Sequence, residues 1–229
     1  MSHFTLAVAT KDMKDLERVM EPYWEELEVE QYIDKTKEQI IEEGKRIKER
    51  IVEKANSGKK LDSWDLGYYN AQTDEDFYDL LTYEDEEYDE EGNHLSTYNP
   101  NSKWDWYSVG GRWNKLLLTK EENTDTIDEG EWGLFSYEGN KETPEGYKWV
   151  NGCQIKKIDF EKMKELSNQD FFTWALLDED EWYEQGQMGW WATNDATEDS
   201  IEDFKRFFIE YMGKEENQDK YLIIVDCHI

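Results

Sequence analysis

Histidines near the two ends of the chain are the first candidates for chemistry. Two of the three histidines, His3 and His228, lie in short apolar segments. Asp226 precedes His228 by two residues, so both side chains would lie on the same face of a strand. If the two segments are neighbours in one sheet, two imidazoles and a carboxylate could converge as an acid–base pair or a metal site. The alternative is that each histidine makes its own structural hydrogen bonds at the end of a sheet.

A second group of candidates surrounds a pair of glycines in the middle of the chain. Gly110 and Gly111 indicate a tight turn or a close approach of the backbone to a neighbouring group. Arg112 follows them, and it could either form a structural ion pair or hold a ligand phosphate. The candidate ligand-binding residues of this region are Trp104, Asp105, Trp106 and Arg112. Either Trp104 or Trp106 could stack on a base.

The two groups could together form one ligand pocket. In that pocket the histidines would exchange protons and Arg112 would hold a phosphate, with Asp105 and Asp226 beside them. The pocket would belong to a phosphoesterase-like enzyme or to a nucleotide-binding protein that sequesters a signal. The sequence alone assigns no catalytic residue, and a structural or regulatory protein without a ligand pocket is a third alternative.

Other classes of site lack their sequence motifs. The chain has no glycine-rich phosphate loop, nucleophile elbow or HExxH helix. Cys153 and Cys227 are far apart and show no CxxC spacing, which argues against a zinc site or a disulfide framework. We therefore expect no metal and no cofactor. No apolar run approaches the length of a membrane span and no signal peptide is recognisable, so we expect a cytoplasmic protein with reduced thiols.

Acidic residues dominate the charge of the protein. Asp and Glu total 56 against 26 Lys and Arg, a formal net charge of −30. Such a charge repels nucleic acids and anionic membranes and favours basic protein surfaces. Residues 61–102 contain no Lys or Arg but many tyrosines, which would anchor a carboxylate-rich surface. The candidate partner-binding residues of this segment are Asp85, Glu86, Glu87, Asp89, Glu90 and Glu91. The alternative is that the acidity serves only solubility.

The pattern of apolar residues predicts an α+β fold. Strands are expected at 3–9 and 221–229, and amphipathic helices at 32–55 and 200–212. A hairpin is expected from 171–182 and 187–193, with its turn at 178–180, and residues 155–166 should begin as a strand and become a helix. We expect a mixed or antiparallel central sheet that contains both terminal strands and carries the two amphipathic helices. Residues 1–229 should form a single domain with an acidic, aromatic-rich insertion at about 61–102.

One short motif is similar to half of an enzyme signature. His3-Phe4-Thr5 resembles the His-x-Thr motif that the 2H phosphoesterases carry twice, and their two histidines act as acid and base on a phosphodiester. The second copy of the motif is missing here, because His228 is followed only by Ile229.

The chain as a whole resembles a family of uncharacterised proteins from phages and prophages. The resemblance rests on MSHFT at 1–5, NPNSKWDWY at 99–107, GGRW at 110–113, MGWW at 188–191 and DCHI at 226–229. It implies a phage origin and one architecture from end to end, but no reaction. A phage origin and a carboxylate-rich surface together favour an inhibitor of a bacterial CRISPR effector or restriction enzyme. Such an inhibitor would bind a basic surface by mimicking a nucleic acid and would bind no nucleic acid itself.

Overall fold

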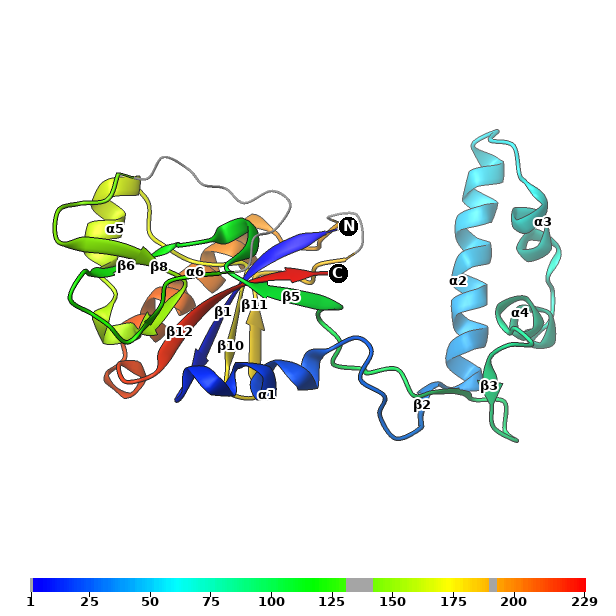
Figure 1. Cartoon of the computed structure of the whole chain (residues 1–229). Helices are drawn as coiled ribbons and strands as arrows, with labels where there is room; N and C mark the ends of the chain where they lie inside the picture. The colour runs from blue at the N-terminus through cyan, green and yellow to red at the C-terminus, as the bar shows by residue number, and fades with distance from the viewer. Residues whose placement is uncertain (1, 131–141, 190–192) are drawn as a thin grey trace. The chain divides into compact units, whose positions relative to one another are not determined.

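The chain divides into two compact units. A computed structural model (Figure 1) describes residues 2–130, 142–189 and 193–229. The first unit is Met1–Leu27 together with Asn99–Ile229, and the second, inserted between them in sequence, is Glu28–Tyr98. The second unit therefore takes in a long helix as well as most of the acidic segment at 61–102. Whether residues 1–229 behave as a single domain stays a prediction.

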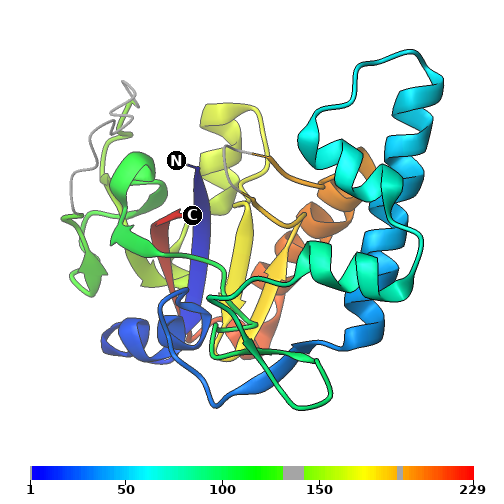
Figure 2. The same ribbon diagram turned by 90° about the vertical axis from the view of Figure 1, so that its right-hand side faces the viewer.

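A seven-stranded sheet forms the centre of the first unit. The strand order is β11-β10-β1-β12-β9-β7, and β5 also pairs with β12. The two terminal strands run side by side and antiparallel, blue and red in Figures 1 and 2, while β1 pairs in parallel with β10. The predicted α+β fold with a mixed sheet containing both terminal strands is thus confirmed. The bounds are β1 His3–Thr10, β5 Trp106–Val109, β7 Thr126–Ile127, β9 Gly152–Gln154, β10 Ala175–Asp178, β11 Glu181–Glu184 and β12 Tyr221–His228.

The two faces of this sheet carry different apolar clusters. Because side chains alternate along a strand, Ala7 and Ala9 of β1 share one face with Leu222 and Ile224 of β12. Helix α6, Glu198–Gly213, covers that face with Phe204, Phe208, Tyr211 and Met212. The opposite face packs against α1, Leu16–Met20. It follows that His3, Asp226 and His228 lie on the α6 face, beyond the residues that α6 covers.

The rest of the first unit differs from the sequence-based prediction in detail. A small sheet joins β6, Leu117–Lys120, to β8, Tyr147–Val150. The predicted strand at the start of 155–166 is wrong: Ile155–Lys157 is a 3-10 turn, followed by α5, Phe160–Ser167. The predicted turn at 178–180 is present, but the hairpin pairs β10 with β11. The second expected arm, 187–193, includes residues 190–192, which lie outside the described residues.

The second unit contains the longest helix of the described part of the chain. Helix α2, Lys37–Asn56, begins at a capping box between Thr36 and Gln39, later than predicted, because Tyr32–Lys35 forms strand β2. The buried Ile47 and Ile51 of α2 pack with Tyr68 of α3. This differs from the expectation that α2 packs on the central sheet. The other elements are α3 Ser63–Asn70, α4 Asp74–Leu81, β3 Glu87–Tyr88 and β4 His94–Ser96. Among the described residues, no helix is both long and apolar enough to span a bilayer.

Candidate functional site

The two terminal histidines lie directly opposite each other. In the antiparallel ladder of β1 and β12, His3 pairs with His228, and their ring centroids are 5.0 Å apart in an edge-to-face arrangement. The terminal strands are therefore neighbours, which is the condition that a shared site of the two histidines requires. Antiparallel partners share one face of a sheet, so both imidazoles and the carboxylate of Asp226 project to the same side.

Each of these imidazoles is held at Nδ1 by a carboxylate. His3 Nδ1 lies 2.8 Å from Asp226 Oδ1, and His228 Nδ1 lies 2.6 Å and 2.7 Å from the two oxygens of Asp105. A carboxylate accepts a hydrogen bond, so the proton of each neutral ring resides at Nδ1 and the lone pair at Nε2. Carboxylate–imidazole pairs of this kind orient histidines that act as general bases.

On the face that carries the histidines, two buried polar atoms at this end of the sheet lack hydrogen-bond partners among the described residues. They are Nε2 of His228, a residue only 4% exposed, and Oγ of Ser108, and neither has a partner among the described residues. Ser108 stands opposite Asp226 in the ladder of β5 and β12, so both orphan atoms belong to the same face. A buried polar atom without a partner costs about 1–3 kcal/mol, which a bound polar molecule would recover.

The glycine pair lets the backbone cross directly over Asp226. Gly110 and Gly111 have φ of 76° and 49°, and a Cβ added to Gly111 would lie 2.5 Å from Asp226 Oδ2. The backbone N–H of Arg112 then donates to the same Oδ2 over 2.8 Å. Of the two alternatives expected for the glycine pair, a tight turn and a close backbone approach, both are present, and the fully buried Asp226 links His3 to this turn. Whether the Arg112 guanidinium holds an anion stays a prediction.

The two candidate tryptophans have different environments. Trp106 stacks on the ring of His228 at 5.0 Å, meets the ring of His3 at 5.5 Å and remains 44% exposed. Trp104 instead belongs to the apolar cluster on the opposite face, where it stacks on Trp24 and donates from Nε1 to Met20 O. The structure thus brings Asp105 and Trp106 to the histidines and leaves Trp104 in the core.

Most of the candidate partner-binding carboxylates are exposed in the second unit. Asp85, Glu86, Glu87, Glu90 and Glu91 are exposed around β3 and the turn that follows it. Asp89 is different, because its carboxylate accepts hydrogen bonds from the backbone N–H groups of Glu91 and Asn93 and from the Asn93 amide. These hydrogen bonds lower the pKa of Asp89, and the bond from the Asn93 side chain has the largest effect. Asp89 therefore holds the turn that displays its neighbours.

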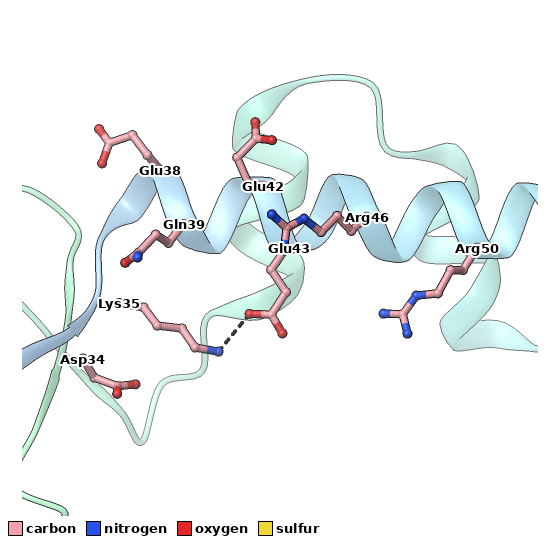
Figure 3. A pocket seen from close by; sticks show the side chains of 8 residues that line it. All are labelled: Asp34, Lys35, Glu38, Gln39, Glu42, Glu43, Arg46 and Arg50. Atoms are coloured by element: carbon pink, nitrogen blue, oxygen red, sulfur yellow. Dashed lines mark hydrogen bonds and ion pairs between the residues drawn. The ribbon is translucent and has the colours of Figure 1, made fainter. Parts of the chain in front are cut away.

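An open groove of about 720 Å³ runs along α2 in the second unit (Figure 3). Its residues carry both charge signs, and Lys35 Nζ pairs with Glu43 Oε2 at 2.8 Å. Arg46 and Arg50 follow one turn apart on the same helix. The groove contains none of the candidate residues of the sequence analysis. Its lining is Asp34, Lys35, Glu38, Gln39, Glu42, Glu43, Arg46 and Arg50.

The third histidine forms a similar pair in a different setting. His94 Nδ1 lies 3.1 Å from Asp34 Oδ2 in the second unit, where both side chains are partly exposed. It provides an internal reference for the two terminal pairs, whose imidazoles are more deeply buried. Within residues 2–130, 142–189 and 193–229, no three His, Cys, Asp or Glu side chains converge closely enough to hold a metal ion.

Sequence reasoning missed two features of the site. Asp105 was a candidate, but nothing in the sequence indicated that it pairs with His228. Ser108 was not a candidate at all, although it follows Trp106 by two residues and therefore lies on the same face of a strand.

Comparison of the chain with known protein families, with curated proteins and with solved structures gives no match to any of them.

Proposed function

We propose that the end of the sheet that carries His3 and His228 binds a phosphorylated ligand of the nucleotide class and exchanges protons with it. The observation that carries this proposal is the Nε2 atom of His228, which is buried and has no hydrogen-bond partner among the described residues. Its ring is fixed by Asp105 at Nδ1, so Nε2 is free to accept a proton. Nothing in a purely structural pair requires such an orphan atom.

Two imidazoles at this separation can act as acid and base on one phosphodiester. One Nε2 would take the proton of the attacking hydroxyl or water as the new P–O bond forms. The other ring, protonated, would give its proton to the leaving oxygen as the old P–O bond breaks. The ring centroids are 5.0 Å apart, a separation that one phosphoryl group can span. The exposed part of Trp106, which stacks on His228, would border the ligand.

The three histidines make this proposal directly testable. In protein labelled with ¹⁵N at histidine, adding a nucleoside 2′,3′-cyclic phosphate should shift the ring nitrogens of His3 and His228. The partly exposed His94–Asp34 pair should not respond. Hydrolysis of the same compound, followed by chromatography, should fall about 100-fold or more in His228→Asn, which keeps a donor toward Asp105 but loses Nε2. His94→Asn is the matched control.

Two results would contradict the proposal. One is an equal response of all three histidines, which would indicate a general effect of ionic strength. The other is the absence of any response of His3 and His228 to a panel of nucleotides, with no turnover, in protein shown to be folded.

We propose, as a second candidate, that the acidic second unit inhibits a bacterial nucleic-acid-targeting defence system. The specific observation is the exposure of five carboxylates around β3, in a stretch from 61 to 98 without a single Lys or Arg. A surface that binds polyanions should accept such an array. The resemblance to phage proteins supports this role and would place the protein in the cytoplasm of an infected bacterium. The target would be a CRISPR effector or a restriction enzyme with a basic surface.

The second candidate predicts a charge-dependent effect on phage growth. We expect the protein to restore plaques of a targeted phage on bacteria that carry the matching defence system. Changing Asp85, Glu86, Glu87, Glu90 and Glu91 to Asn or Gln should reduce plaque recovery at least tenfold, because long-range attraction to the basic partner is lost.

The matched control for this experiment removes the same number of exposed charges from the first unit. It changes Glu161, Glu202, Glu210, Glu215 and Glu216 to Gln. Equal plaque recovery with both variants, or none with the unchanged protein on any defence system tried, would argue against inhibition by mimicry.

A further inference from the structure

A pocket of about 700 Å³ lies on the same side of the central sheet as the histidine pair. This volume is within the range of small-molecule sites, about 300–1,000 Å³. Its walls come from β1, from the segment after β5, from α5 and from the residues that lead into β10. They include Thr5, Trp113, Met163, Gln169, Phe171 and Phe172.

Thr5 connects this pocket to the candidate site. It follows His3 by two residues on β1, so the two side chains lie on the same face about 7 Å apart. In the ladder with β12, Thr5 stands directly opposite Asp226, the partner of His3. Trp113, on another wall, follows Gly111, which crosses over Asp226. The pocket therefore adjoins the buried carboxylate of the site.

The lining suits a flat aromatic group. Phe171 is fixed by ring contacts with Phe160 and Phe208, at centroid distances of 6.2 Å and 5.9 Å, and Phe172 and Trp113 add two further rings. The lining includes two carboxylates: Asp170 is paired with Lys164 at 2.7 Å, and Glu142 is exposed. The Thr5 hydroxyl and the Gln169 amide supply hydrogen-bonding groups at the edges. Aromatic walls with a few polar groups bind planar heterocycles by stacking.

We infer that this pocket holds the nucleobase of the ligand whose phosphate lies at His3 and His228. The inference rests on the proposed acid–base function of that site, and it adds where the nucleobase of the ligand binds. A base in this pocket would be enclosed by its walls, whereas a base stacked on Trp106 would lie on the exposed surface. The spacing of His3 and Thr5 along β1 corresponds to the ribose that separates a phosphate from a base.

The experiment measures binding of adenosine 5′-monophosphate and of ribose 5-phosphate by calorimetry, together with the ¹⁵N shifts of the histidine rings. We expect the unchanged protein to bind the nucleotide at least tenfold more tightly than the sugar phosphate, because only the nucleotide fills the pocket. Phe172→Leu removes a ring from the wall and should weaken nucleotide binding about tenfold while leaving sugar phosphate binding unchanged.

Two control variants make the result specific. Phe207→Leu changes a half-buried ring of α6 that contacts Tyr183 and does not line the pocket, and it should bind the nucleotide normally. Trp106→Leu removes the other platform for a base, and it should weaken nucleotide binding less than Phe172→Leu does.

The outcomes separate this inference from the proposed function. If both ligands bind equally well and shift His3 and His228, the pocket assignment is wrong and the acid–base site stands. If nucleotide binding is lost only in Trp106→Leu, the base lies on Trp106 and the inference is again wrong. If neither ligand, nor a nucleoside 2′,3′-cyclic phosphate, binds or shifts the two histidines, the proposed function itself fails.

Discussion

Replacing Gly111 with alanine should destabilise the protein by about 3 kcal/mol or more. The residue has φ of 49°, where a side chain is strained, and an added Cβ would lie 2.5 Å from Asp226 Oδ2 and 2.6 Å from Ser108 Oγ. Asp226 cannot move away easily, because it is fully buried on a paired strand and its oxygens bind His3 and the backbone of Arg112. The free energy of unfolding can be measured by urea denaturation.

Gly146 separates the two causes of this effect. It has φ of 76° in the same unit, but an added Cβ would meet no atom within 4 Å. Gly146→Ala should therefore cost only the strain of the positive φ, about 1–2 kcal/mol. If Gly111→Ala is no worse than Gly146→Ala, the close approach over Asp226 does not constrain the turn.

Removal of the Asp226 carboxylate should lower the free energy of unfolding by an amount similar to that expected for Gly111→Ala. Asp226 is fully buried, and its two oxygens bind His3 Nδ1 and the backbone N–H of Arg112. In Asp226→Ala both donors would remain buried without an acceptor, which should cost about 3–5 kcal/mol. Asp226→Asn preserves the shape and one acceptor, so it should cost less. Its ¹⁵N spectrum should show an altered His3 ring, since the carboxylate no longer fixes the proton at Nδ1.

Asp34 provides the comparison for Asp226, because it also pairs with a histidine but lies in an exposed setting. Asp34→Ala should change the free energy of unfolding by less than about 1 kcal/mol. Similar losses for Asp34→Ala and Asp226→Ala would show that burial does not strengthen the terminal pair.

The convergence of His3, Asp226 and His228 could be predicted from sequence because two local rules act together. A short apolar strand at each end of a chain needs partners in the sheet, and residues two apart on a strand share a face. These rules placed the three side chains together, and the ladder of β1 and β12 confirms it. The same rules could not choose between Trp104 and Trp106. Trp104 precedes β5 and packs with Trp24, a contact between residues far apart in sequence.

For the acidic segment too, composition predicted the kind of surface but not the role of every residue. Its composition indicated a carboxylate-rich surface, and five of its six candidate partner-binding residues are exposed. Asp89 is an exception because its position in the turn gives it three hydrogen bonds, with Glu91 and Asn93. Similarly, α2 was recognisable as an amphipathic helix, but its apolar face did not reveal that α3 and α4 would cover it.

The sequence by itself determined the fold class, the terminal strands, the main helices and the excess of negative charge, because apolar periodicity and composition are local properties of the chain. Only the tertiary structure decided that Asp105 binds His228, that Gly111 crosses Asp226 and that a pocket lined by Thr5 and Phe172 adjoins them. These contacts join segments more than 100 residues apart, such as Asp105 and His228. Their geometry depends on strand order and register, which no single segment encodes.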